Sequence, residues 1–203
     1  MTERSIAQEA KRRQLLDAAV RVFARKGFHT SRVGDVAEEA GVSHGLLYHY
    51  FDSKDELLQA IFTETWSELL DSLAAVQASD APAKEQLRQV AAILLRSWRR
   101  QPDVVRVIVQ EIGRSSQLGE RSTELRAVED AIERIIRRGQ EAGELRGGVD
   151  ARLAATIFYG GIDEFLTSWV FGLVPGDDDA VAAAERTLLD VVCGGLAATA
   201  GRA

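Results

Sequence analysis

The chain has 203 residues, of which 46% are hydrophobic and 28% are charged. This composition is ordinary for a globular protein, and the length allows one larger domain or two small ones. A single cysteine, Cys193, excludes a scaffold of internal disulfides. The first residues are charged and lack an apolar signal-peptide core, and every uncharged stretch is shorter than the roughly 18 residues of a membrane span. We therefore expect a cytoplasmic protein without a membrane partner.

The net charge of −6 is unevenly distributed along the chain. Residues 1–55 hold nine Lys and Arg and eight Asp and Glu, a net charge of +1, so the remainder carries −7. An acidic protein is not the usual nucleic-acid binder, but the placement of charge matters more than its total. The acidic excess lies away from the N-terminal segment and does not oppose DNA contact there.

Apolar residues recur three and four positions apart along most of the chain, which is typical of helices. Glycine or proline interrupts the pattern at Gly27, Gly41, Pro82 and Pro102, as expected at helix ends and starts. The pattern predicts an all-α protein of about nine helices. We expect them near residues 6–26, 30–40, 43–51, 55–78, 83–100, 104–112, 120–144, 150–171 and 178–199.

The first predicted helix begins with a basic run at residues 11–13, Lys-Arg-Arg. Such a run is either an ordinary solvated helix start or a source of attraction for DNA phosphates. The sequence leaves both interpretations open.

The predicted helices at residues 30–40 and 43–51 form a helix-turn-helix. Gly41 supplies a tight turn with a positive φ, which a side chain would oppose. Ser43 is a natural N-cap, because its hydroxyl can accept a backbone N–H of the second helix. Leu46, Leu47 and Phe51 can then pack inward, while His44, Tyr48 and His49 point outward. A helix of this kind is suited to the major groove of DNA.

The same segment resembles the signature of TetR-type transcriptional regulators. The resemblance is ungapped and covers about the first quarter of the chain. It implies an all-helical homodimer with an N-terminal three-helix DNA-binding domain and a C-terminal ligand-binding and dimerisation domain. We place these at residues 1–54 and 55–203. The matching residues are Ala40, Gly41, Val42, Ser43, Gly45, Leu47, Tyr48, Tyr50, Phe51, Ser53 and Lys54.

The resemblance also implies phosphate contacts outside the second helix. Thr30 and Ser31 open the first helix of the pair, which they can cap, and hydroxyl residues there contact phosphate in the family, as Lys54 does. Gly34 departs from the family pattern, in which this position often bears a side chain that reaches a base. We therefore expect readout of double-stranded DNA, at a palindromic operator, mainly from residues 43–49. The candidate DNA-binding residues are Thr30, Ser31, Arg32, Ser43, His44, Gly45, Leu46, Tyr48, His49 and Lys54.

Metal binding and catalysis find little support in the sequence. All three histidines lie in the N-terminal segment, and His44 and His49 are five residues apart, one more than the spacing that puts two ligands on one helical face. The C-terminal part has no histidine, which excludes a Ser-His-Asp site there. We expect no metal, no other cofactor and no enzymatic activity.

Large apolar side chains on separate C-terminal helices are either plain core or the lining of a ligand cavity. The TetR resemblance implies a cavity and an apolar small-molecule effector. Residues 158–170 further resemble one helix of the fatty-acid-degradation regulators of this family, which implies a long-chain acyl-CoA. The alternative is a regulator of an efflux or catabolic gene that responds to a drug-like or other apolar metabolite. The candidate ligand-binding residues are Trp66, Leu69, Leu70, Trp98, Val105, Ile112, Phe158, Ile162, Phe165 and Trp169.

Paired glycines occur in each of the last two predicted helices. A glycine inside a helix costs about 1 kcal/mol relative to alanine, so the pairs need a packing reason. A four-helix bundle between two subunits provides one, and the family dimerises in this way; close packing of helices within one subunit is the alternative. The candidate interface residues are Ile157, Gly160, Gly161, Glu164, Ser168, Leu188, Val191, Gly194 and Gly195.

The sequence as a whole predicts a dimeric repressor that an apolar ligand releases from its operator. A helical small-molecule-binding or protein-interaction module without DNA function is the alternative from another class. Steep salt dependence of DNA binding would argue against that alternative.

Overall fold

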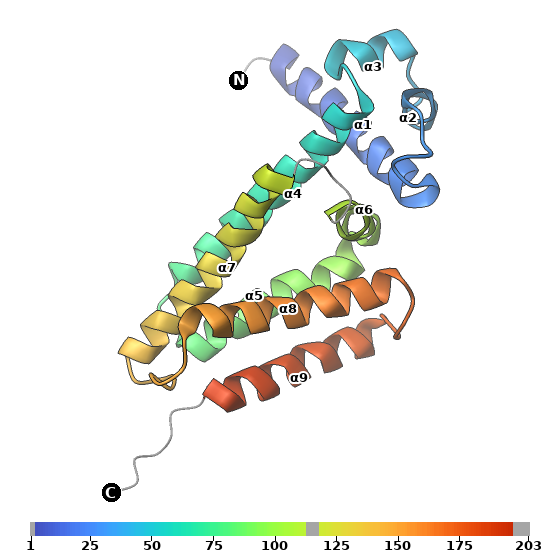
Figure 1. Cartoon of the computed structure of the whole chain (residues 1–203). Coiled ribbons are helices and arrows are strands. Elements are labelled where there is room, and N and C mark those ends of the chain that lie inside the picture. The colour runs from blue at the N-terminus through green and yellow to red at the C-terminus, as the bar shows by residue number, and fades with distance from the viewer. Residues whose placement is uncertain (1–2, 113–117, 197–203) are drawn as a thin grey trace, which may run out of the picture.

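A computed structural model describes residues 3–112 and 118–196, and within these ranges the chain forms nine α-helices and no strand. This confirms the predicted all-α class. Figure 1 labels the helices in chain order. Their bounds are α1 Glu3–Lys26, α2 Val33–Glu39, α3 His44–Tyr50, α4 Lys54–Gln77, α5 Ala83–Arg100, α6 Pro102–Ile112, α7 Leu118–Glu141, α8 Ala151–Val170 and α9 Asp178–Leu196.

Helices α1, α2 and α3 form a small unit at one end of the molecule, which we call the head (Figure 1). Its core is aromatic and aliphatic, with Phe23, Val36 and Leu47 buried from three different helices. Phe28, from the loop after α1, packs edge-on against Phe23 with ring centroids 5.3 Å apart. The burial of these side chains stabilises the arrangement in which α3 lies on the outside of the head.

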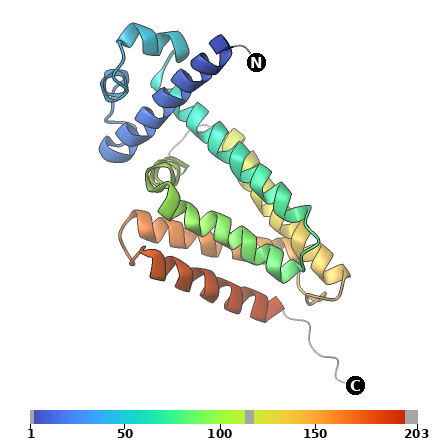
Figure 2. The ribbon, with the colours of Figure 1, turned by 180° about the vertical axis from the view of Figure 1, so that it is seen from behind.

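Helices α4 to α9 form the rest of the molecule, which we call the body. Helix α4 leaves the head and runs beside α7, while α5, α8 and α9 lie next to one another in both views (Figures 1 and 2). The short helix α6 lies between α1 and α8, where head and body meet. Fully buried side chains from α5, α7 and α8 make the centre of the body, including Leu87, Ile132 and Phe158. None of the helices within the described ranges is long and apolar enough to cross a membrane.

The start of α2 differs from the prediction. The helix begins at Val33, and Arg32 is its N-cap residue; the Arg32 N–H donates to the Asp35 carboxylate at 2.7 Å. The hydroxyl of Ser31 instead donates to the carbonyl of Phe28 at 2.8 Å and is buried. The expectation that Thr30 and Ser31 cap this helix is therefore wrong, because residues 27–32 form a separate loop.

Candidate DNA-binding surface and ligand cavity

The turn before α3 has the predicted geometry. Gly41 has a φ of +66°, and the Ser43 hydroxyl accepts the Leu46 N–H at 3.2 Å, which caps α3. Leu47 is fully buried and Phe51 nearly so, and both fix α3 to the core of the head. These contacts hold the opposite face of α3 toward solvent.

The exposed face of α3 carries groups that can form hydrogen bonds. His44 and His49 are exposed, and Tyr48 has half of its surface in contact with solvent. Gly45 has no atom within 4 Å of the place where a Cβ would lie, and Leu46 is half-buried beside it. Imidazole and phenol groups on a projecting helix can contact base edges or phosphates in a groove.

Gly34 on α2 lies directly under the side chain of His44. A Cβ added to Gly34 would be 3.0 Å from the Cε1 atom and 3.2 Å from the Nε2 atom of the His44 ring. The glycine that lacks a base-reaching side chain therefore provides the space for the imidazole of the next helix. Sequence reasoning missed this contact, since ten residues separate the two positions.

Lys54 points into the protein. Its ammonium group donates to the carbonyls of Phe28 at 2.7 Å and Ser31 at 3.1 Å, with the His29 carbonyl at 3.4 Å. It also lies 4.4 Å from the centroid of the Phe28 ring, a cation–π distance. These contacts use the three donors of the ammonium group and tie the loop of residues 27–32 to the start of α4. The phosphate contact expected of Lys54 remains a prediction.

The hydroxyl residues of the same loop differ in accessibility. Thr30 is exposed, and its hydroxyl donates to the carbonyl of Lys26. Ser31 is only 3% exposed. Arg32, the next residue, is exposed at the start of α2. Of these three candidate DNA-binding residues, Thr30 and Arg32 are thus accessible.

The basic run at the start of the chain divides between two environments. Arg12 forms an ion pair with Glu64 of α4, and its guanidinium lies 5.5 Å from the centroid of the Phe51 ring. Arg13 is exposed, and Lys11 donates to Gln14 of its own helix at 2.9 Å. Arg12 therefore joins α1 to α4, and attraction of phosphate remains a prediction for Lys11 and Arg13.

Three more basic side chains of the head are paired with carboxylates. Arg21 and Arg25 donate to Glu39 at 2.7 and 2.9 Å, and Lys26 donates to Asp35 at 2.8 Å. The hydrogen bonds from the two arginines hold the pKa of Glu39 below its usual value. Much of the positive charge of the head is thus balanced locally.

The loop of residues 27–32 also contacts the body. The Nε2 atom of His29 lies 3.4 Å from a carboxylate oxygen of Glu111, near the end of α6. Glu111 is buried, while His29 is exposed. This loop therefore touches both α4, through Lys54, and α6, through His29.

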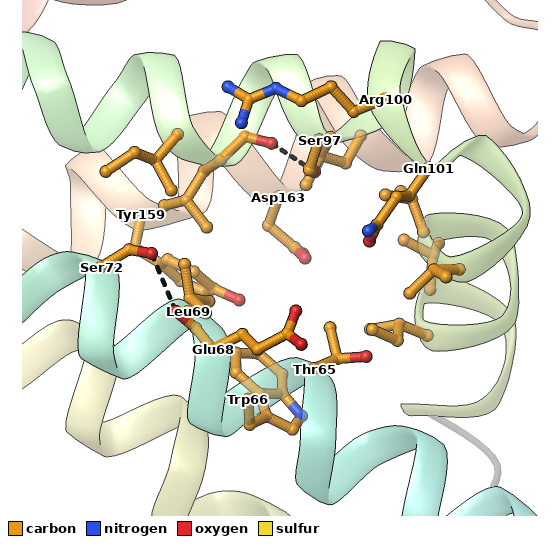
Figure 3. A pocket seen from close by; sticks show the side chains of 17 residues that line it. Thr65, Trp66, Glu68, Leu69, Ser72, Ser97, Arg100, Gln101, Tyr159 and Asp163 are labelled. Carbon is orange, nitrogen blue, oxygen red and sulfur yellow. Dashed lines mark hydrogen bonds between the residues drawn. The ribbon is translucent and has the colours of Figure 1, made fainter. Parts of the chain in front are cut away.

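A cavity of about 220 Å³ lies between α4, α5, α6 and α8 (Figure 3). Trp66 and Leu69 line it from α4, and Val105 lines it from α6. These three were among the ten residues expected at a ligand site. Sites for small molecules are concave and mostly apolar with a few polar groups, which describes this cavity.

The other expected ligand residues lie elsewhere. The side chain of Ile112 falls outside the described residues, and the other six do not line the cavity. On α8 the stripe Phe158, Ile162, Phe165 and Trp169 packs into the body, with the rings of Phe165 and Trp169 stacked 5.9 Å apart. Leu70 and Trp98 pack against the core, where the Trp98 indole donates to the Gly176 carbonyl at 3.0 Å.

The α8 residues that do line the cavity are the next ones around the helix, namely Tyr159, Asp163 and Leu166. Partial burial, followed by the nearby Asp163, raises the pKa of Tyr159. Burial and then the neighbouring Glu164 raise the pKa of Asp163, although solvent still reaches its carboxylate through the cavity. Sequence reasoning selected the more apolar stripe and missed this one.

The outer faces of α8 and α9 are apolar and exposed. Ile157 is 65% exposed and Val191 is 69% exposed, and Leu153, which sequence reasoning missed, lies one turn before Ile157. Added Cβ atoms at Gly160, Gly194 and Gly195 would meet nothing within 4 Å, and Glu164 is exposed on the same side of α8 as Gly160.

Three other expected interface residues pack within the subunit. A Cβ at Gly161 would lie 2.8 Å from the Cδ1 atom of Leu188, so this glycine permits the close approach of α8 and α9. Leu188 and Ser168 are buried. The structure thus supports the explanation within one subunit for Gly161, and the interface between subunits remains a prediction for the other three glycines.

No group of three or more His, Cys, Asp or Glu side chains that could hold a metal ion gathers in the described part of the chain.

A helix-turn-helix head joined to a helical body with an internal cavity defines the class of ligand-responsive DNA-binding regulators. Two family descriptions match: "Bacterial regulatory proteins, tetR family" over residues 15–61, and "Tetracyclin repressor-like, C-terminal domain" over residues 84–192. The chain belongs to the TetR family and is a TetR-type transcriptional repressor.

Similar proteins include a regulator of fatty acid metabolism and another transcriptional repressor. The fatty acid metabolism regulator protein of Bacillus subtilis (strain 168) is 30% identical over 90% of this chain and 94% of its own length. The repressor KstR2 of Rhodococcus jostii (strain RHA1) is 26% identical over 94% of this chain and 93% of its own length. These relatives are transcriptional regulators, and they confirm the resemblance to fatty-acid-degradation regulators.

The fold is also similar to solved structures. A structure of the transcriptional regulator FadR from Bacillus subtilis in complex with stearoyl-CoA matches with a TM-score of 0.79 at 30% identity, over 90% of this chain and 98% of that one. A structure of the fatty acid degradation regulator FadR from Bacillus halodurans matches with a TM-score of 0.79 at 26% identity, over 92% of this chain and 96% of that one.

Proposed function

We propose that the protein is a homodimeric repressor that a long-chain acyl-CoA releases from a palindromic operator. The observation that supports this choice of ligand is the cavity between α4, α5, α6 and α8. The fold around it matches a regulator whose structure contains stearoyl-CoA. Each subunit would insert α3 into one of two major grooves about 34–36 Å apart, or a multiple of that spacing.

The outer faces of α8 and α9 support the homodimer. Exposed Ile157 and Val191 leave apolar surface in water, and burial of such surface against a second copy is favourable. The open glycines Gly160, Gly194 and Gly195 would let a partner helix approach closely, which offsets their cost inside a helix.

Two helices connect the cavity with the head. Helix α4 contributes Trp66 to the cavity and Lys54 to the loop of residues 27–32, and α6 contributes Val105 to the cavity and Glu111 to the same loop. A shift of either helix would change the position of this loop and hence of α2 and α3. We place the boundary between the DNA-binding and ligand-binding domains at the start of α4, after residue 54.

The size of the cavity bears on how a ligand acts. Its volume of about 220 Å³ is below the roughly 300–1,000 Å³ of typical ligand sites, so a long acyl chain requires it to widen. A ligand shifts an equilibrium only through its different affinity for the two states. An acyl chain would therefore stabilise a wider arrangement of the four helices, in which the two heads no longer fit their half-sites.

In this proposal the protein acts by binding DNA and ligand and catalyses no reaction. It does so in the cytoplasm. The experiment that tests this function is fluorescence anisotropy on DNA from the region upstream of its own gene. We expect binding that stearoyl-CoA reverses and that free CoA does not. DNA binding that neither compound affects would support the DNA-binding function and contradict acyl-CoA as the ligand. A drug-like or other apolar metabolite would then be the effector. If the protein does not bind this DNA even at low salt, the proposal that its operator lies upstream of its own gene is wrong.

A further inference from the structure

The centre of the cavity is polar although its walls are apolar. Figure 3 shows the carboxylates of Glu68 and Asp163 facing each other across the space, with the Tyr159 hydroxyl and the Gln101 amide pointing in from its sides and Arg100 at the edge. Among the described residues, none of these five head groups forms a hydrogen bond or ion pair. In the absence of a ligand, their hydrogen bonds are left to solvent in the cavity.

A ligand that fills this space removes that water. Polar groups taken out of water need replacement hydrogen bonds, and those left without them oppose binding. An unsubstituted hydrocarbon chain offers no donor and no acceptor. The lining of the cavity therefore disfavours a plain saturated chain at this point.

The mixture of donors and acceptors selects the kind of polar group. A carboxylate in the ligand would face the like charges of Glu68 and Asp163. An ammonium group would suit these two carboxylates, but the acyl chain of the proposed effector carries none. A hydroxyl group is neutral and both donates and accepts. It can donate to a carboxylate while it accepts from the tyrosine or the glutamine side chain.

We infer that the effector is an acyl-CoA whose chain carries a hydroxyl group, and that this hydroxyl donates to Asp163. The inference rests on the proposed function, since it takes the acyl-CoA from there. Asp163 is the acceptor because it projects from α8 into the middle of the cavity (Figure 3). It is the residue that distinguishes a hydroxylated chain from a saturated one.

The surroundings of Asp163 strengthen such a bond. Burial and then Glu164 raise the pKa of its carboxyl group, so the charged form is less well stabilised than that of a fully hydrated aspartate. A carboxylate in this condition gains more from a new donor, and hydrogen bonds to charged groups are the strong ones.

The test is titration calorimetry of the full chain with stearoyl-CoA, 3-hydroxystearoyl-CoA and 12-hydroxystearoyl-CoA, which carry the hydroxyl at two depths. We expect at least one hydroxylated chain to bind about tenfold more tightly than stearoyl-CoA, as one hydrogen bond to a charged group provides. Asp163→Leu should reverse this order, with weaker binding of the hydroxylated chain and tighter binding of stearoyl-CoA. A misfolded variant would not bind any ligand more tightly. Asp71→Leu, at an exposed position of α4 outside the cavity, is the matched control and should keep the wild-type order.

The possible outcomes separate this inference from the proposed function. Equal binding of all three ligands overturns the preference for a hydroxylated chain, while the proposed function as an acyl-CoA-responsive repressor still stands. Binding of the hydroxylated chains alone supports the inference and removes saturated acyl-CoA from the proposed function. Binding of none of the three overturns both. An unchanged order in Asp163→Leu overturns the role of this residue.

Discussion

The contact between Gly34 and His44 concerns two residues on different helices of the head. A glycine in a helix costs up to about 1 kcal/mol relative to alanine, and here its missing Cβ leaves room for an imidazole. The position of the imidazole on the exposed face of α3 therefore depends on a residue of the neighbouring helix.

Gly34→Ala should separate stability from DNA binding. We expect the variant to be as stable as the wild type or more stable, by up to about 1 kcal/mol, because alanine favours the helix. Operator affinity should fall about tenfold, because the new Cβ displaces the His44 ring. Urea unfolding measures the first quantity and fluorescence anisotropy the second.

The control for this prediction is the same substitution in a His44→Ala background. With no imidazole to displace, Gly34→Ala should then leave DNA affinity unchanged, as in a double-mutant cycle. An equal loss of affinity in both backgrounds would show that the effect does not pass through His44.

Lys54 offers a second test at the scale of a single residue. Because its ammonium group satisfies carbonyls of the loop of residues 27–32, Lys54→Ala should lower the free energy of unfolding by about 1–3 kcal/mol. Urea unfolding without DNA measures this loss. A residue that acted only as a surface phosphate contact would change stability by no more than about 0.5 kcal/mol, and would instead reduce the salt dependence of DNA binding.

At the scale of elements, the loop of residues 27–32 is where α4 and α6 both meet the head. The contact between His29 and Glu111 belongs to neither the cavity nor the DNA-binding face. Its contribution should therefore appear in the coupling between the two sites and not in either affinity alone.

His29→Ala should reduce the effect of ligand on DNA binding. We expect the Kd for operator and the Kd for stearoyl-CoA, each measured alone, to stay within about twofold of wild type. The ratio of operator affinities without and with stearoyl-CoA should fall by about threefold to tenfold, within the usual range of a coupling contact. Thr63→Ala, at an exposed position of α4 outside the cavity, serves as the control for anisotropy. An unchanged ratio in His29→Ala would contradict the role of this contact.

Local spacing predicted the helix-turn-helix well and the cavity poorly, for a physical reason. The turn at Gly41, the cap at Ser43 and the inward face of α3 depend on neighbours within a few residues, so the sequence contains their cause. Hydrophobic periodicity on α8 marks the side that packs into the core, and it selected Phe158 instead of Tyr159. Cavities accommodate polar groups, so apolar spacing alone does not find their lining.

Long-range contacts account for the other differences. Lys54 finds its carbonyl partners 23 to 26 residues earlier in the chain, and no local pattern indicates that its side chain turns inward. The paired glycines of α8 have different surroundings although they are adjacent, because Gly161 faces α9 and Gly160 faces outward.

At the scale of the whole molecule, the exposed faces of α8 and α9 set the expected assembly. Ile157→Arg places a charge in the proposed interface, where burial without a partner is costly. We expect the variant to be folded but monomeric in sedimentation velocity, with operator affinity reduced at least tenfold. Thr63→Arg adds the same charge at an exposed position of α4 and should remain dimeric. A dimeric Ile157→Arg protein would place the interface elsewhere.

The local pairing of basic side chains in the head has a consequence for the number of molecules a cell requires. In the described part of the head, Arg12, Arg21, Arg25 and Lys26 are engaged with carboxylates, so these four are less able to displace counterions from arbitrary DNA. A chromosome offers millions of competing sites, and a repressor that adheres weakly to them is not sequestered there. A small pool of subunits would then suffice to keep one operator occupied, and the level of effector would matter more than the rate of synthesis.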